Sequence, residues 1–449
     1  MWLDACLPFW KLRLIRNQRL ARQSLLCRNR QRFAQLVAYV ARRSPYYARI
    51  IRERGIVPER ARPEDFPILT KSDLIEHFDE IVTEPNLTRE RIERFLATSR
   101  DPRDLLDGRY VVVHSSGTSG QLTLCAYTLR EWTQGWISLF RVLPFLGPLP
   151  RRTAFVGATN GHFASVSLVS TAHWLTIRHF HRTHLFDINR PWQEIIDGLN
   201  EYRPHNLSCY GSILGMLAIE QERNNLRIRP RHILCGGDPL LAHDRERAER
   251  VFRAPVSDVY ATTETMVLGL SEPRRKGLLL LEDDLCIEVE QDRLLVTSLR
   301  HHLMPLIRYA LSDSVILAPQ EEPRQYRGFR RIERLAGRRE DNLDLVNERG
   351  VQDFIHPLLL VEFYVPGIDR FQVRRTSLTS LVFRVKPRGN LTPAELNRLL
   401  RDVRQRWREI LAQKHMQNVR YDVELTDELP VDARTGKFRL VVGSTAKAA

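Results

Sequence analysis

Residues 111–127 read VVVHSSGTSGQLTLCAY, and the small residues at the centre of this stretch decide how the chain is interpreted. The β-branched run at 110–113 predicts a buried strand, and residues 122–127 predict a second short strand. Between them lie Ser115, Ser116, Gly117, Thr118, Ser119 and Gly120. Glycines let the backbone approach a ligand, successive N–H groups can form a concave anion site, and hydroxyls add donors. A polar hairpin loop without a ligand is the alternative at this point.

The loop at 115–120 resembles the phosphate loop of the adenylate-forming enzymes, which include acyl-CoA synthetases, peptide-synthetase adenylation domains and luciferase. The family loop usually reads [ST]SGT[ST]G-x-P-K. This chain departs from it after the second glycine, with Gln121 and Leu122 and no lysine. It is not a P-loop either, because the spacing GxxxxGK[ST] is absent here.

Two turns that follow predicted strands also match the family. The first contains Gly236, Gly237 and Asp238 before Pro239-Leu240, and it resembles the G-[AG]-[ED]-P-L turn whose backbone packs on adenine. The second, YATTE at 260–264, is similar to Y-G-x-[ST]-E. The resemblance implies that Tyr260 stacks on adenine, Thr263 bonds the phosphate and Glu264 ligates Mg²⁺. The chemistry is consistent, because a hard dication needs a carboxylate oxygen and a flat base needs an aromatic face.

Three further motifs follow in the order that the family shows. PLIRYALSD at 305–313 implies that Asp313 accepts hydrogen bonds from the ribose hydroxyls, as an ionised carboxylate can. GRREDNL at 337–343 implies that Arg338 contacts ribose and that Glu340 is the hinge about which a small domain rotates. TGKFR at 435–439 implies that Lys437 contacts the substrate carboxylate and the α-phosphate during adenylation.

Four residues are candidates for the side of the site that binds the carboxylic acid. Tyr210, Gly211 and Ser212 follow a predicted strand, near where the family builds its acid-binding wall, and packing is the alternative. His162 could gate the acyl pocket, and an ordinary loop histidine is the alternative. None of the expected wall positions is acidic. Since a buried α-ammonium would need an acidic partner, a flat, mostly apolar acid is favoured over an amino acid.

The segments SPYY at 44–47 and DFPILTKSDL at 65–74 resemble the phenylacetate–CoA ligase and coenzyme F390 synthetase-like branch. We therefore expect an α/β fold with a large N-terminal domain at 1–338, whose first 100 residues are mainly helical. A small mobile α+β domain at 339–449 is expected to carry the catalytic lysine. Strand-like runs at 153–158, 206–210, 231–235 and 256–260 belong to an alternation of strands and helices from about 150 to 335, which is typical of α/β folds. The helical pattern at the front breaks at 44–47. Helix caps are predicted at Thr70, at Thr128 with a capping-box spacing, and at Thr392 ahead of Pro393.

The resemblance implies that ATP and Mg²⁺ activate a carboxylic acid to an acyl-adenylate with release of pyrophosphate. The acyl group is then transferred to the thiol of CoA or of a phosphopantetheine carrier protein. The loop and the 258–264 element also resemble hydroxybenzoate–carrier-protein ligases. The alternatives are transfer to an amine, as in indoleacetate–lysine synthetases, and an inactive Arg-rich binding module.

The cysteine pattern and the hydropathy of the chain indicate its cellular compartment. The six cysteines are scattered without a CxxC pair, which favours a reducing compartment, and no apolar run reaches the length of a membrane span. We expect a cytoplasmic enzyme without a secretion signal.

Residues 1–60 hold fourteen Lys and Arg against three acidic residues, a net charge of +11 out of +15. This basic front could bind anionic lipid, as a weak peripheral association, or an acidic carrier protein. A solvated helix face without a partner is the alternative. We expect no nucleic-acid partner.

Overall fold

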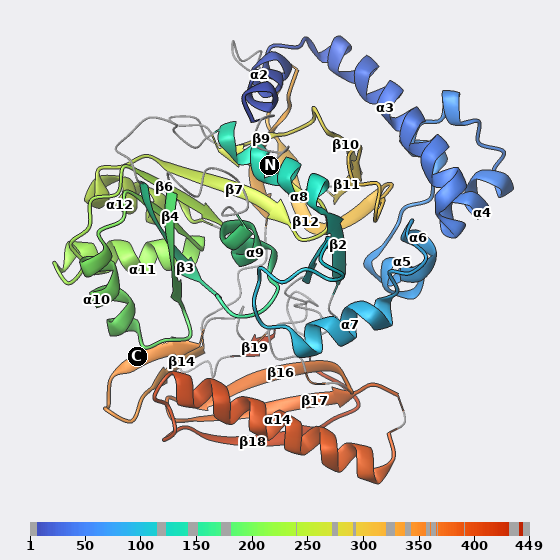
Figure 1. Ribbon diagram of the computed structural model, residues 1–449. Coiled ribbons are helices and arrows are strands. Elements are labelled where there is room, and N and C mark those ends of the chain that lie inside the picture. Colours follow the sequence, from blue (N-terminus) through green and yellow to red (C-terminus); the bar gives the residue numbers. More distant parts are fainter. Residues whose placement is uncertain are drawn as a thin grey trace.

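The computed structural model describes residues 7–114, 123–141, 151–171, 181–238, 240–271, 277–290, 293–319, 328–336, 343–355, 360, 365, 367–389, 391–430 and 440–442. It has the mixed α/β architecture that the sequence predicts, with the C-terminal elements gathered below the larger part of the molecule (Figure 1).

The centre of the molecule is an eleven-stranded sheet in the order β10-β11-β12-β13-β9-β8-β7-β6-β5-β3-β4. Its strands are β3 (Arg151–Gly157), β4 (His181–Asp187), β5 (Asn206–Cys209), β6 (His232–Gly236), β7 (Val256–Thr262), β8 (Met266–Ser271), β9 (Leu278–Leu280), β10 (Leu285–Glu290), β11 (Arg293–Ser298), β12 (Tyr309–Leu317) and β13 (Arg331–Ala336). The strands from β3 to β7 pair in parallel, and those from β7 onward pair antiparallel. The strands predicted near 153, 206, 231 and 256 are therefore confirmed.

Helices connect the parallel strands, as crossover connections require. They are α9 (Ala164–Thr171), α10 (Trp192–Tyr202), α11 (Gly211–Glu222) and α12 (Ala242–Phe252). Each buries apolar residues in one cluster with the strands, for example Ile195 and Leu199 of α10. This packing holds the carboxyl ends of β5, β6 and β7 at one edge of the sheet, where ligands bind in such folds.

A two-stranded hairpin, separate from the central sheet, flanks residues 115–122. Strand β1 (Tyr110–His114) pairs antiparallel with β2 (Leu124–Thr128), and both are buried over most of their length. Thr128 then caps α8 (Leu129–Ser138) by accepting from the Glu131 backbone N–H, while the Glu131 carboxylate accepts from the Thr128 N–H. The 3₁₀ turn η3 (Leu139–Arg141) follows. The capping box predicted at Thr128 is confirmed.

The front of the chain is helical, as expected. Its elements are α2 (Leu7–Gln18), α3 (Arg22–Arg43), α4 (Pro45–Glu53), η1 (Pro58–Arg60), η2 (Pro63–Asp65), α5 (Lys71–Glu76), α6 (Phe78–Ile81) and α7 (Arg89–Thr98). The break expected at 44–47 is the junction between α3 and α4, where Pro45 takes the first helical position. Thr70 caps α5 as predicted.

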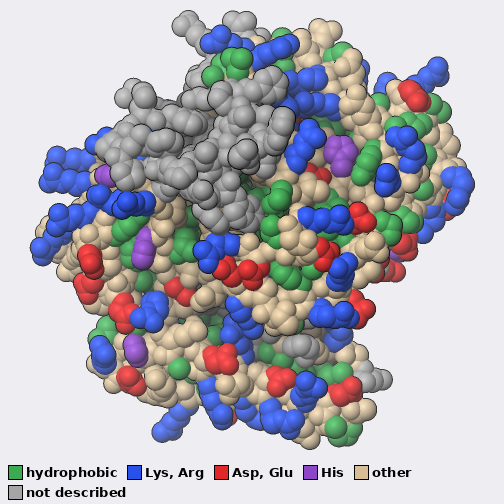
Figure 2. Space-filling model, in the orientation of Figure 1, with side chains coloured by type: hydrophobic (Ala, Val, Ile, Leu, Met, Phe, Trp, Pro, Cys, Tyr) green, Lys and Arg blue, Asp and Glu red, His purple; other side chains and the backbone are tan. Residues whose placement is uncertain are grey.

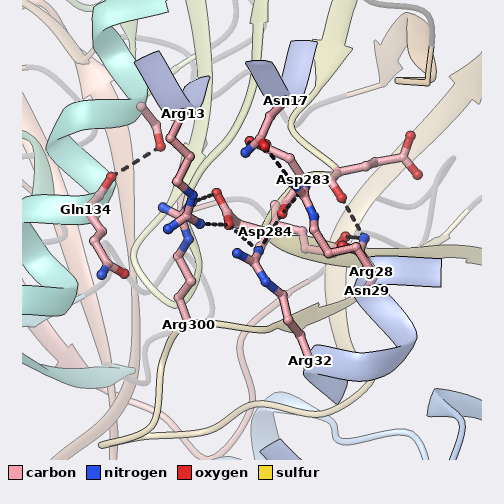
Figure 3. Close-up of polar contacts among 12 residues, drawn as sticks. Arg13, Asn17, Arg28, Asn29, Arg32, Gln134, Asp283, Asp284 and Arg300 are labelled. Carbon is pink, nitrogen blue, oxygen red and sulfur yellow. Dashed lines mark hydrogen bonds and ion pairs between the residues drawn. The ribbon is translucent and has the colours of Figure 1, made fainter. Parts of the chain in front are cut away.

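Part of the basic front is neutralised inside the molecule. Asp284, before β10, accepts from the guanidinium groups of Arg13 at 3.0 Å and Arg32 at 2.9 Å (Figure 3). Asp283 accepts from the side-chain amide of Asn17 at 2.8 Å and lies fully buried. Because a buried carboxylate needs such partners, these contacts fasten α2 and α3 to the sheet. Arg13 is therefore an internal ion-pair partner rather than a free surface charge.

The C-terminal elements form a four-stranded sheet in the order β18-β17-β16-β19, together with a long helix and a separate two-stranded hairpin. They are β14 (Leu343–Val346), β15 (Gln352–Ile355), β16 (Ile368–Ser377), β17 (Ser380–Pro387), α14 (Pro393–Gln413), β18 (Arg420–Leu425) and β19 (Val441–Val442). Thr392 caps α14 ahead of Pro393, as predicted. Lys414 is fully buried, with Nζ 3.3 Å from the Asp353 carboxylate and 4.8 Å from the centre of the Phe354 ring. The domain boundary predicted at 338–339 lies outside the described residues.

None of the helices in the described part of the chain has both the length and the apolar character needed to cross a bilayer.

Candidate active site

The predicted nucleotide residues lie at the carboxyl end of β7 and in β12, which are separated in the sheet by β8, β9 and β13. The Tyr260 hydroxyl donates to the Asp313 Oδ2 at 2.9 Å. Burial, together with the neighbouring Asp313 charge, raises the pKa of Tyr260 well above its ordinary value, so this hydroxyl stays protonated and remains a donor. The residues predicted to stack on adenine and to bind ribose are thus held together. The Tyr260 ring itself is buried, and its stacking role stays a prediction.

Glu264, the predicted magnesium ligand, lies in the turn between β7 and β8 and is partly exposed. Its Oε1 accepts from the Tyr309 hydroxyl at 3.1 Å. Burial, with Glu264 as the next cause, raises the pKa of Tyr309 well above the usual range. The hydroxyl of Tyr127, in β2, donates to the Thr263 carbonyl oxygen. The strand that follows the predicted phosphate loop therefore contacts the turn that carries Thr263 and Glu264.

Tyr127 and Tyr309 are site residues that sequence reasoning missed. Tyr309 lies inside the 305–313 motif, which gave a role to Asp313 alone, and Tyr127 closes the opening stretch of the sequence. Both are buried and both direct a hydroxyl at the Thr263–Glu264 turn. Tyr127 ends a predicted strand and Tyr309 lies inside a motif, and the sequence offered no further signal for either.

The donor set at Glu264 suits a magnesium ion that is shared with a substrate. Glu264 Oε2 makes no hydrogen bond to a described residue, while Oε1 is held by Tyr309. Within the described ranges no group of three or more His, Cys, Asp or Glu could hold a metal. Mg²⁺ usually keeps its waters and takes one or two carboxylates plus substrate phosphates, so a single carboxylate is compatible with the ion.

On the acid side, Tyr210 is buried at the end of β5, and its hydroxyl accepts from the Ala158 N–H at 3.2 Å. Gly237, after β6, has a φ of +91°, and a Cβ built there would lie 2.8 Å from the Tyr210 ring atom Cδ1. The room that this glycine leaves is therefore filled by Tyr210. Gly236 likewise lies close to a neighbouring strand, because a Cβ built there would lie 3.0 Å from the Val259 carbonyl oxygen.

The Asp238 carboxylate points at the start of α11. Its carboxylate accepts from the Ser212 backbone N–H at 3.2 Å and from the Ser212 hydroxyl at 2.5 Å. Since Gly211 is the first residue of α11, Asp238 satisfies a free backbone donor of that helix. The turn after β6 is in this way tied to the helix after β5.

His162 is buried, with its Nε2 2.8 Å from the Ser99 hydroxyl and its ring against Phe95. Burial lowers the pKa of His162 below its ordinary value. Its carbonyl oxygen accepts from the His114 N–H at 3.0 Å, so it supports the end of β1. These contacts favour packing, the alternative to a gate.

Several predicted residues lie outside the described part of the chain. They are the loop residues Ser115, Ser116, Gly117, Thr118, Ser119 and Gly120, together with Arg338, Glu340 and Lys437. The described ends of β1 and β2 bracket the loop.

Comparison with known proteins agrees with this architecture. No family model matches the chain. A phenylacetate–coenzyme A ligase of Thermus thermophilus is 24% identical over 329 residues, covering 66% of this chain and 67% of that protein. The solved structure of 2-hydroxyisobutyryl-CoA ligase, in an open conformation with 2-HIB-AMP and CoA, is similar with a TM-score of 0.56. That comparison covers 94% of this chain and 91% of the other at 19% identity.

The chain shares its fold with 2-hydroxyisobutyryl-CoA ligase. The same ligase in its thioesterification state gives a TM-score of 0.57 at 20% identity and covers 94% and 89% of the two chains. The predicted α/β class and the resemblance to the phenylacetate–CoA ligase branch are therefore confirmed. At these identities the structural likeness is one of fold, and the activity has to be argued from the site.

Proposed function

We propose that the protein uses ATP to activate a carboxylic acid as its acyl-adenylate, and then transfers the acyl group to a thiol. The observation that carries the proposal is the pair of hydrogen bonds Tyr260–Asp313 and Tyr309–Glu264. They bring together, at the carboxyl end of β7, the two motifs that we assign to ATP binding. The names of the similar ligases, which refer to carboxylic acids, AMP and CoA, support the same reaction class.

In the proposed nucleotide site, Asp313 accepts from the ribose hydroxyls while Tyr260 keeps the carboxylate oriented. Glu264 would hold Mg²⁺ through Oε2, because Oε1 accepts from Tyr309. When bound, the ion neutralises charge on the phosphates. Gly236 and Gly237 bring backbone close to adenine, and Arg338 contacts ribose.

The substrate carboxylate attacks the α-phosphorus in line, a P–O bond forms, and the bond to pyrophosphate breaks with its electron pair leaving on the pyrophosphate oxygen. The loop at 115–120 and Thr263 hold the departing phosphates. Lys437 contacts the acid and the α-phosphate, where negative charge shifts in the transition state. Positioning and charge stabilisation are the main contributions that proteins make to phosphoryl chemistry.

After adenylation, the C-terminal unit turns about Glu340 and a thiol attacks the acyl carbon, so that AMP leaves. The thiol of CoA is the acceptor favoured by the similar ligases, and a phosphopantetheine carrier protein supplies the same chemistry. The described residues that we assign to the reaction include no nucleophile of the enzyme's own, and the reaction does not need one.

The substrate we propose is a flat, mostly apolar acid. An amino-acid substrate would need a carboxylate beside its α-ammonium group. The nearest candidate, Asp238, already accepts two hydrogen bonds from Ser212. A competition among benzoate-type acids, medium-chain fatty acids and proteinogenic amino acids tests this choice, and even a tenfold preference in kcat/KM for an amino acid would overturn it.

Acid-dependent exchange of labelled pyrophosphate into ATP tests the proposed reaction. We expect exchange with at least one apolar acid, and its loss in Asp313→Asn, because an amide cannot replace the carboxylate that accepts from both hydroxyls. Asp427→Asn, which changes an exposed carboxyl, is the matched control and should exchange like the parent protein. A parent protein that binds ATP but exchanges pyrophosphate with no acid in the panel would contradict the proposal.

A further inference from the structure

Helix α2 places apolar and basic side chains together on its outer face. Leu12, Ile15 and Arg16 follow the spacing i, i+3 and i+4, which puts them on one side of the helix, and Arg19 comes directly after its last residue. Leu12 is 65% exposed and Ile15 39% exposed, and both arginines are exposed. We call these four residues the α2 outer face.

The opposite side of α2 is fixed to the molecule, so the outer face cannot turn inward. Leu14, Asn17 and Gln18 are buried. Asn17 donates to Asp283, and Arg13 pairs with Asp284 (Figure 3). Arg16 and Arg19, in contrast, form no ion pair with any residue in the described ranges. The basic front is thus divided into an inner set, used for folding, and an outer set that is left for a partner.

Exposed apolar side chains gather in the same part of the chain. The large hydrophobic residues that are exposed, among those described, are Leu12, Ile15, Leu26, Val57, Ile316, Val351, Leu378 and Leu425. Three of them fall within residues 12–26, and exposed Arg30 follows in α3. Hydrophobic and basic side chains lie together at the top of the space-filling view, where Figure 1 places α2 (Figure 2). Single exposed hydrophobic residues are ordinary, whereas this grouping beside arginines that form no ion pair with the described part of the chain is not.

The combination points to one kind of partner. An acidic protein or a nucleic acid would pair with the arginines, but its polar surface would leave Leu12 and Ile15 largely exposed to water. The surface of an anionic bilayer satisfies both, because apolar side chains enter the acyl boundary while guanidinium groups meet lipid phosphates. We propose that the α2 outer face binds the surface of a bilayer that contains anionic phospholipid, weakly and reversibly. This inference does not depend on the proposed reaction.

Vesicle sedimentation of the full chain tests the proposal, with phosphatidylcholine vesicles prepared with and without phosphatidylglycerol. We expect binding to the anionic vesicles alone. Two variants should weaken it by about tenfold or more each: Leu12→Glu, which removes the apolar contact, and Arg16→Glu with Arg19→Glu, which reverses the local charge. Because these side chains are exposed, thermal melting should show all variants folded, and pyrophosphate exchange in solution should equal that of the parent.

Matched controls separate a local face from a general charge effect. Arg401→Glu with Arg404→Glu makes the same charge change at the same spacing on exposed positions of α14. Leu378→Glu changes another exposed leucine. Both controls should bind vesicles like the parent. The proposal is overturned if the parent does not bind anionic vesicles, if Leu12→Glu binds as well as the parent, or if the control pair loses as much. It is also overturned if the arginines are needed for an acidic carrier protein and not for vesicles.

Discussion

The two halves of the candidate site differ in what their polar groups contact. On the nucleotide side, Tyr260 and Tyr309 donate to Asp313 and Glu264, carboxylates that stay partly exposed. On the acid side, the Tyr210 hydroxyl accepts from the Ala158 N–H, and the Ser212 hydroxyl donates to Asp238 of the neighbouring turn. Carboxylates held by one donor still have oxygens for a ligand, whereas the acid-side groups already serve the turns that carry them. We infer that the first half is organised for a ligand and that the second half is mainly structural support.

The largest effect is expected at Lys437, whose assigned chemistry belongs to the nucleotide side. Lys437→Ala should lower the adenylation rate by about 10²–10³, because one charge contact to the transition state is lost. Thioester formation from preformed acyl-AMP should be nearly unchanged, and single-turnover assays of the two half-reactions separate them. Pyrophosphate exchange at the parent rate would remove Lys437 from the mechanism.

Asp258, in β7 between the two halves, should make stability depend on pH. Burial raises the pKa of Asp258 from 3.8 to about 6, with Asp238 adding to the effect and Arg245 opposing it. The folded state therefore holds a proton that the unfolded chain has lost between pH 4 and 6, so the contribution of Asp258 to stability falls as pH rises through this range.

Asp258→Asn removes that titration. The free energy of unfolding of the variant, relative to the parent, should rise by up to about 3 kcal/mol between pH 4 and pH 7. Urea unfolding at each pH measures this difference, which is independent of any constant cost of the substitution. Asp427→Asn, at an exposed site, is the control. A difference that does not change with pH would contradict the account.

Tyr309→Phe tests whether the hydrogen bond to Glu264 supports catalysis on the nucleotide side. Losing the hydrogen bond to Glu264 should slow adenylation by about fivefold to tenfold, in line with about 1 kcal/mol for one such bond. The effect should appear at saturating acid and should depend on the magnesium concentration. Tyr202→Phe, which removes a hydroxyl bonded to the distant Arg182 carbonyl, is the control and should keep the parent kinetics. Equal losses in both variants would mean a general structural effect.

Tyr210→Phe tests the other half and should have the smallest effect on catalysis. Its hydroxyl satisfies the Ala158 N–H, so the free energy of unfolding should fall by about 1 kcal/mol. The KM for ATP should not change, and kcat/KM for the acid should change by less than about threefold. A large loss of acid affinity with full stability would show that this hydroxyl binds substrate, contrary to the comparison.

Local signals explain what the sequence could predict. The caps at Thr70, Thr128 and Thr392 are confirmed because each depends on residues within one turn. Apolar runs bounded by turn residues predicted β3, β5, β6 and β7 to within a few residues. The long antiparallel half of the sheet was not predicted, since its strand order depends on pairings between distant segments.

The residues of the candidate site also differ in whether the sequence could predict them. Asp313 and Glu264 belong to short motifs, but their tyrosine partners come from other strands, and no spacing in the sequence reveals such contacts. The capping of α11 by Asp238 is likewise a tertiary contact. The internal pairing of Arg13 with Asp284 joins residues 271 positions apart, so composition alone could not separate Arg13 from Arg16 and Arg19.

The most direct test of the account is a crystal structure of the protein with AMP. We expect the ribose hydroxyls to donate to the Asp313 carboxylate and adenine to lie against the turn at 236–238, next to Tyr260. A nucleotide bound away from Asp313 and Tyr260 would contradict the central claim that these residues form the ATP site of an adenylate-forming enzyme.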